Sequence, residues 1–288
     1  MNPIKTVKTV KKRYRVITAM KYLFLSIASI LSIFPFFWMI VSATNTTREI
    51  TAGKMTFGTH LVENLSKLFG SDLHFLRALG YSALIAIITT AIALVISSIG
   101  GYGFEIFRSK ARDRVFNFLL TSMMIPFCAL MIPLYRMFSA VGKAGFSALG
   151  LNTLFCVIAP FCATAFLVFF FRQNAKSFPK DILEAARLDG LSEPGIFFRM
   201  YMPVMKASYT AAAIITFMNS WNNYLWPLVA LQDPDKRTIP LILSAMGSSY
   251  TPDYGVIMCG IVLATLPTGF LFFVMQKHFV AGMIGAVK

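Results

Sequence analysis

The stretch ALGYSALIAIITTAIALVISSIGGYGF, residues 78–104, runs for 27 consecutive positions without Asp, Glu, Lys or Arg. As a helix it rises about 40 Å, which exceeds the roughly 30 Å hydrocarbon core of a bilayer. Five other charge-free runs are long enough to cross a membrane: 22–47, 115–135, 144–171, 207–232 and 254–276. Backbone polar groups in lipid must be satisfied within their own segment, so each run is expected to be helical. The sequence therefore predicts an all-α membrane protein with six transmembrane helices.

The overall composition supports this prediction. Hydrophobic residues make up 57% of the 288-residue chain and charged residues only 14%, whereas a soluble domain carries roughly 25% charged residues. The mean hydropathy is +0.67. So little charge cannot cover a soluble globule of this size, and the apolar content is too high for a disordered chain. A soluble enzyme and a disordered chain are therefore both excluded.

The formal net charge of +15 reflects an uneven distribution of basic residues. Nineteen of the 27 lie in residues 1–21, in the connectors 105–114 and 172–206, and after residue 276. Basic residues concentrate on the cytoplasmic side of membrane proteins, so both termini are expected in the cytoplasm. We expect a basic cytoplasmic N-terminal segment (1–21), one six-span domain (22–280) and a cytoplasmic tail (281–288). The charge then reflects topology and anionic membrane lipid, and no nucleic-acid partner is expected.

The predicted spans carry no group suited to ion coupling or to ATP hydrolysis. No Asp, Glu or His lies in any of the six runs, although ion-driven carriers use such groups as relays or ligands. No GxxxxGK[ST] motif is present to hold phosphates. All four cysteines lie within the runs, without metal-binding spacing. Neither an enzyme nor a metal or other cofactor is expected. Active transport would draw its energy from another subunit, and an ATP-independent carrier or channel is the disfavoured alternative.

The fifth run has the most polar centre. Its residues Asn219, Asn222, Asn223 and Trp226 are spaced at i, i+3, i+4 and i+7, which places them on one face of a continuous helix. Three amides and an aromatic ring on one face suit a translocation path for a sugar. The same amides also suit hydrogen bonding between packed membrane helices. Both interpretations stay open.

The connector 172–206, RQNAKSFPKDILEAARLDGLSEPGIFFRMYMPVMK, predicts two short helices. The first covers 180–188 after Pro179 and stops at Gly190 in the left-handed conformation. The second is capped by Ser192 and closes before Pro203. An amphipathic stripe on the first helix can pack on the chain itself, on lipid headgroups or on a partner protein. The stripe consists of Ile182, Leu183 and Ala186.

The same connector carries a long motif. Glu184-Ala185-Ala186-x-x-Asp189-Gly190, followed by Phe197, Arg199 and Pro203, resembles the EAA loop of permease subunits in bacterial binding-protein-dependent ABC importers. Similarity continues in the fifth run at 221–228 and in the first cytoplasmic connector at 101–112. The ending 280–288 is also similar. The chain resembles the smaller, six-span permease of the carbohydrate-importer branch, of the maltose-importer type.

This resemblance implies a type I ABC importer permease fold in the bacterial inner membrane. The implied partners are a second homologous permease, two ATP-binding cassette ATPase subunits, an extracytoplasmic substrate-binding protein and a sugar substrate. The connector 172–206 becomes the coupling loop, in which Glu184 contacts a basic group of the ATPase. Ala185 and Ala186 form its close-packing face and Gly190 its turn. The coupling set is completed by Leu183, Arg187 and Asp189. A glycerol phosphate compound is the alternative solute.

Overall fold

The computed structural model describes the backbone of residues 3–285 and the side chains of Arg15 and residues 17–276. All regular elements within residues 3–285 are helices. Five of the seven basic side chains expected in the N-terminal segment (Lys5, Lys8, Lys11, Lys12 and Arg13) lie outside the described part, as do the last three residues of the tail. The contacts divide the chain into two units. The first holds the chain up to Leu68 together with Ser249–Val262, and the second begins at Phe69 and includes the rest.

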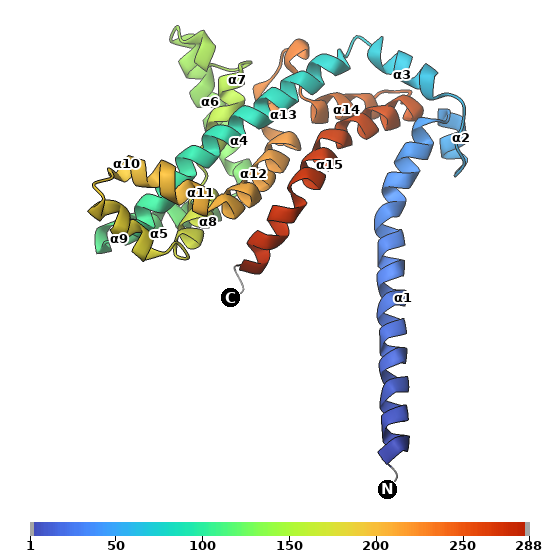
Figure 1. Cartoon of the computed structure of the whole chain (residues 1–288). Helices are drawn as coiled ribbons and strands as arrows, with labels where there is room; N and C mark the ends of the chain where they lie inside the picture. Colours follow the sequence, from blue (N-terminus) through green and yellow to red (C-terminus); the bar gives the residue numbers. More distant parts are fainter. Residues whose placement is uncertain (1–2, 286–288) are drawn as a thin grey trace. The chain divides into compact units, whose positions relative to one another are not determined.

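Within residues 3–285, four segments are long and apolar enough to cross a membrane (Figure 1). They lie in α1 (Pro3–Ala43), α4 (Phe75–Ile106), the helical segment 147–175 and α15 (Tyr254–Gly285). The segment 147–175 consists of η2 (Ser147–Leu149), α7 (Leu154–Ile158), η3 (Ala159–Phe161) and α8 (Ala165–Ala175). All four coincide with runs predicted from the sequence.

The run 115–135 is not one straight helix. It is divided between α5 (Lys110–Thr121), which continues into η1 (Ser122–Met124), and α6 (Phe127–Lys143), and the two parts are bent by 99°. Pro126 directly precedes α6 and places Ile125 in an extended conformation, as proline does for the residue before it. Counted as one bent span, this pair gives a fifth crossing.

The run 207–232 is also broken, and the prediction of a continuous helix there was wrong. It consists of α12 (Lys206–Trp221), which is 16 residues long, and α13 (Leu225–Ala230). Pro227 causes the interruption, because in a continuous helix it would clash with the carbonyl of residue 223. In the first turn of α13, Pro227 needs no hydrogen-bond partner for its nitrogen.

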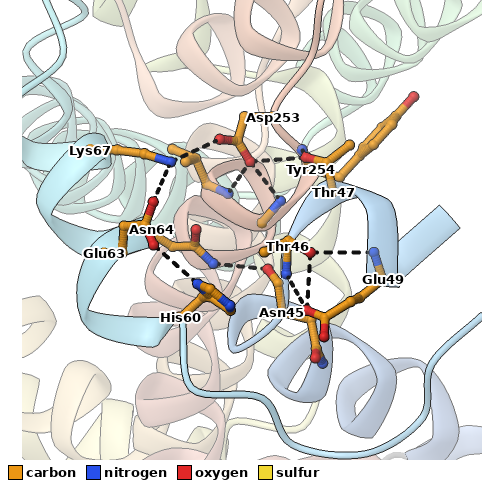
Figure 2. Close-up of polar contacts among 12 residues, drawn as sticks. Asn45, Thr46, Thr47, Glu49, His60, Glu63, Asn64, Lys67, Asp253 and Tyr254 are labelled. Carbon is orange, nitrogen blue, oxygen red and sulfur yellow. Dashed lines mark hydrogen bonds and ion pairs between the residues drawn. The ribbon is translucent and has the colours of Figure 1, made fainter. Parts of the chain in front are cut away.

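A polar junction at the C-terminal end of α1 holds the first unit together (Figure 2). The Asn45 side chain donates hydrogen bonds to the carbonyls of Val41 and Thr56, both at 2.9 Å. The Asn64 side chain, on α3 (Leu61–Phe69), donates to the carbonyls of Ala43 and Asn45, both at 3.0 Å. The last turn of any helix leaves carbonyls without partners, and these two amides satisfy those of α1 inside the protein.

The first turn of α15 completes this junction. Asp253 accepts a hydrogen bond from the Thr47 hydroxyl at 3.0 Å and from the backbone N–H groups of Gly255 and Val256. Thr47 begins the short helix α2 (Thr47–Thr51). A Cβ on Gly255 would lie 2.5 Å from the Asn45 carbonyl oxygen. The absence of a side chain at Gly255 therefore lets α15 approach α1 this closely.

Two ion-paired carboxylates lie on the exposed side of the junction (Figure 2). Lys67 and then His60 hydrogen bond to Glu63, at 2.8 and 3.0 Å, and lower its pKa to about 2. Lys54 lowers the pKa of Glu49 to about 2 as well. Both carboxylates therefore stay charged at neutral pH.

In the second unit, α4 is the central helix and packs against α8 and α12. Small residues on α4 allow the approach: Ala93 is fully buried among Leu167, Phe171 and Ala212. The contact is tightest at Gly101, where a Cβ would lie 2.6 Å from the backbone nitrogen of Arg172. Close backbone approach at small residues is the usual basis of helix packing in membranes.

Candidate coupling elbow and polar cavity

The predicted first helix of the connector is present as α9, with the predicted bounds Lys180–Leu188. It ends at Asp189, and Gly190 follows with φ +77°. The Gly190 N–H donates to the Arg187 carbonyl and the Leu191 N–H to the Ala186 carbonyl, at 3.1 and 3.0 Å. This pair of bonds is a Schellman motif, which favours glycine at the left-handed position. The prediction that Gly190 forms the turn is confirmed.

The second helix does not close before Pro203, and that prediction was wrong. After α10 (Glu193–Ile196) the chain continues as a π-helical turn, η4 (Phe197–Tyr201), and then as α11 (Met202–Val204). The wider turn accommodates Pro203, whose ring would otherwise meet the carbonyl of Arg199. Ser192 occupies the expected cap position, although its side chain makes no capping hydrogen bond. We call α9 and α10 together the elbow.

One face of α9 packs on the chain itself. Leu183 and Ala186 are 6% and 5% exposed. They lie in a core cluster with Tyr102 from the end of α4, Ile196 from α10 and other residues of the second unit (Phe178, Phe197, Tyr201 and Met205). Figure 1 shows α9 and α10 beside the C-terminal end of α4. Ala186 is therefore not available as a contact face for a partner, which corrects the expectation from the EAA resemblance.

The other face of α9 is exposed. It presents Glu184, Ala185 and Leu188, followed by Asp189. Leu188 is 88% exposed and lies one helical turn beyond Glu184, at i+4. Leu188 was missed in the sequence because it falls outside the buried stripe. Its position at i+4 from Glu184 was the signal that could have identified it. An apolar side chain exposed on a short polar helix suits insertion into a partner's groove.

Arg187 turns towards the chain. Its guanidinium pairs with the Glu193 carboxylate at 2.8 Å, and the Tyr102 hydroxyl donates to the same carboxylate at 3.3 Å. The guanidinium also lies 5.9 Å from the centre of the Phe107 ring. These contacts connect α9 to α10 and to the end of α4, although the Arg187 side chain remains partly exposed.

A cavity of about 450 Å³ lies between α4, α6, α8 and α12 in the second unit. Amides, hydroxyls and aromatic rings line it: Thr89, Phe127, Phe161, Thr164, Phe166, Leu167, Ile215, Thr216, Asn219, Ser220, Asn222, Asn223, Tyr224 and Leu225. We call it the polar cavity, after the amides and hydroxyls that lie within its mostly apolar lining. None of these lining residues is charged. The structure brings three of the four predicted path residues together, namely Asn219, Asn222 and Asn223.

Trp226, the fourth predicted path residue, does not line the polar cavity. Its side chain is fully buried, and its indole N–H donates to the Cys156 carbonyl at 2.7 Å. The prediction of one helical face was wrong here, because α12 ends at Trp221 and the chain changes direction before α13. Trp226 therefore belongs to the core between α6, α7 and α13.

The side chains around the polar cavity leave hydrogen-bonding capacity for a solute. The Asn222 amide donates within its own chain segment, to the Met218 carbonyl at 2.9 Å. Thr89 is 1% exposed and its hydroxyl has no hydrogen-bond partner among the described residues. A buried hydroxyl without a partner costs free energy. The two interpretations of these amides, a solute path and hydrogen bonding between helices, both stay predictions.

Comparison with known proteins identifies the family of this chain. Residues 94–285 match the family model described as "Binding-protein-dependent transport system inner membrane component". The chain belongs to this family. It is therefore a multi-pass permease subunit of a binding-protein-dependent transport system of the bacterial inner membrane. Members of the family with known roles are transport permeases, which are non-catalytic subunits.

Three curated family members illustrate its relationships. The chain is 48% identical to the lactose transport system permease protein LacG of Rhizobium radiobacter, over 96% of this chain and 98% of that protein. It is 34% identical to the arabinooligosaccharides transport system permease protein AraQ of Bacillus subtilis, over 92% and 94%. It is 30% identical to the sn-glycerol-3-phosphate transport system permease protein UgpE of Escherichia coli O1:K1, over 92% and 95%.

The fold of this family member also resembles a solved structure. A chain from the crystal structure of a bacterial ABC transporter involved in the import of the acidic polysaccharide alginate superposes with a TM-score of 0.80. The match covers 92% of this chain and 97% of that chain, at 18% identity. At this identity the likeness shows the fold, which is that of an ABC importer permease.

Proposed function

We propose that this permease forms half of the translocation path of an ATP-driven importer for a sugar or oligosaccharide. The polar cavity carries this proposal: it combines three amides, several hydroxyls and aromatic rings without any charged residue. Amides and hydroxyls pair with sugar hydroxyls, and aromatic rings pack on the apolar faces of sugars. The relatives LacG and AraQ, a lactose and an arabinooligosaccharide permease, point to the same solute class.

A glycerol phosphate compound is the second candidate, because UgpE is 30% identical over most of the chain. Phosphate recognition in proteins relies on Arg, Lys or helix N-termini. No Arg or Lys is among the residues that line the polar cavity. The cavity chemistry therefore favours a neutral solute.

In the proposed topology the chain crosses the membrane six times, with both termini in the cytoplasm. The sixth crossing is the broken pair of α12 and α13, which coincides with the charge-free run 207–232. This assignment places the elbow, the basic connector 105–114 and the N-terminal segment on one side. It agrees with the concentration of basic residues in these segments.

The proposed assembly contains a second homologous permease, two ATPase subunits and an extracytoplasmic binding protein. The elbow docks on the ATPase through Glu184, Ala185, Leu188 and Asp189, which are among the residues that it exposes. ATP binding closes the ATPase pair and displaces the elbow, and the helices around the polar cavity move between inward-open and outward-open states. Each ligand shifts the equilibrium by its difference in affinity for the two states.

An uptake assay in a strain lacking this permease tests the proposal. We expect deletion to lower uptake of at least one labelled disaccharide or oligosaccharide by about ten-fold or more, equivalent to ~1.4 kcal/mol. Uptake of sn-glycerol 3-phosphate should be unchanged. When the permease gene is reintroduced, the restored sugar uptake should survive a protonophore and stop when ATP is depleted. Loss of glycerol phosphate uptake alone would favour the second candidate, and uptake abolished by the protonophore alone would reject ATP coupling.

The double substitution Asn222→Leu and Asn223→Leu is expected to reduce sugar uptake by about ten-fold to a hundred-fold, because polar groups of the solute would lose their hydrogen-bond partners. The loss should vary between sugars, and the amount of assembled importer should stay as in the wild type. Uptake of a series of sugars, normalised to the amount of complex in the membrane, measures this. Trp226→Phe is the matched control for the core, and it should lower stability without changing the order of preference among the sugars. A uniform loss that parallels the loss of complex would show that the two amides act in helix packing.

A further inference from the structure

A buried ion cluster lies where the elbow joins the membrane helices. Arg172 is the one charged residue that is buried among residues 17–276, with its side chain 7% exposed. Its guanidinium donates a hydrogen bond to Glu105 at 3.3 Å and a second one to Asp113. It also lies 4.0 Å from the centre of the Phe116 ring. We call these four residues the Arg172 cluster.

The cluster joins three helices. Glu105 lies in the last turn of α4, Asp113 and Phe116 lie on α5, and Arg172 lies in the last turn of α8. The planar guanidinium fixes direction as well as distance, because it binds two carboxylates at its edge and stacks on an aromatic ring with its face. Removing Arg172 would take this ion-pair partner from the mostly buried Glu105 carboxylate, and Asp113 would keep only its exposed pair with Arg108. The three helix ends are therefore held in one arrangement.

Two of these helices lead towards the polar cavity, and one of them, α8, also leads to the elbow. From α8 the chain enters α9 after the four residues 176–179, and the opposite end of α8 lines the cavity with Phe166 and Leu167. From α5 the chain continues through the 99° bend into α6, whose first residue, Phe127, lines another part of the cavity. The Arg172 cluster thus joins α8, which lines one part of the cavity, to α5, which leads into α6 and another part of the lining.

We propose that Arg172 is a positioning residue that transmits displacement of the elbow from α8 to the α5–α6 wall of the polar cavity. Without the cluster, α8 would follow the elbow while α5 and α6 stayed behind, and the cavity would fail to change its exposure. ATP would then be hydrolysed without solute movement. This inference rests on the proposed coupling to an ATPase.

Arg172→Lys tests the proposal, because lysine keeps the charge but lacks the planar, forked guanidinium that contacts both carboxylates and the Phe116 ring. The complete importer is purified and reconstituted, and ATP hydrolysis and labelled sugar uptake are measured in the same vesicles. We expect the complex to assemble and hydrolysis to persist, while solute imported per ATP falls about ten-fold or more, equivalent to ~1.4 kcal/mol. Asp113→Asn should lower the same ratio.

Arg108→Gln is the matched control. Arg108 pairs with the same Asp113 carboxylate at 3.2 Å, but its side chain is 61% exposed, so its loss should leave the ratio as in the wild type. An unchanged ratio in Arg172→Lys, or a loss of uptake and hydrolysis in equal proportion, would overturn the proposal. Failure of both Arg172→Lys and Asp113→Asn to assemble would assign the cluster to folding and also overturn it. A wild-type importer without ATP-dependent uptake would instead reject the proposed function.

Discussion

Leu188→Asp is expected to abolish solute uptake while the permease remains folded in the membrane. Leu188 is 88% exposed, so the substitution removes no packing within the chain. In the proposed assembly Leu188 inserts into a groove of the ATPase, where a carboxylate would be buried without a partner. Truncation of such an anchor typically costs 2 kcal/mol or more, which corresponds to about 30-fold in affinity. Co-purification of the ATPase with the tagged permease, together with uptake, measures the effect.

The matched control is Leu188→Met, which keeps an apolar side chain of similar volume at this position and should retain uptake. Normal ATPase binding by Leu188→Asp would contradict docking through this face of α9. The interface would then have to be sought elsewhere on the second unit.

Gly101→Val is expected to prevent accumulation of folded permease. A Cβ at this position would lie 2.6 Å from both the backbone nitrogen of Arg172 and the Phe171 Cβ. The nearest atoms belong to the backbone of α8 or lie directly beside it, so a small side-chain rotation cannot relieve the clash. Overpacking usually costs about 1–3 kcal/mol, occasionally more, and here it would separate α4 from α8 and disrupt the Arg172 cluster. The amount of protein in the membrane and its melting temperature in detergent measure the loss.

Gly103→Val provides the matched control, because Gly103 lies on the same helix and nothing lies within 4 Å of its Cβ position. Both substitutions carry the same intrinsic effect on helix propensity, and any difference between them therefore reports the contact with α8. Equal accumulation of the two variants would contradict the close approach of α4 and α8.

Local rules account for the features that the sequence predicted well. The charge-free runs located the membrane segments because lipid excludes charge wherever a helix crosses it. The bounds of α9 follow from Pro179 before it and Gly190 after it, since both residues act through their own backbone conformation. The EAA motif indicated the family for a similar reason: its residues are adjacent in sequence and keep their spacing in any member.

The incorrect predictions concern continuity and direction. Helical periodicity assumes one straight axis, and the breaks before α6 and after Trp221 change that axis. Asn219, Asn222 and Asn223 nevertheless reach the polar cavity because they lie close to the break, whereas Trp226 lies beyond it and enters the core. In the elbow, the stripe of Ile182, Leu183 and Ala186 left three packing surfaces open, and the structure packs Leu183 and Ala186 on the chain itself. The expectation from the EAA resemblance that Ala186 faces a partner was wrong.

The sequence by itself determined that this is a helical membrane permease, where its apolar segments lie, and which connector carries the coupling motif. Each of these depends on composition or on residues close together in the chain. Only the tertiary structure decided which face of α9 is exposed, which amides line the cavity, and that Arg172 meets Glu105 and Asp113. Those partners are separated from Arg172 by 67 and 59 positions. Their contact depends on how α4, α5 and α8 pack, which no local pattern specifies.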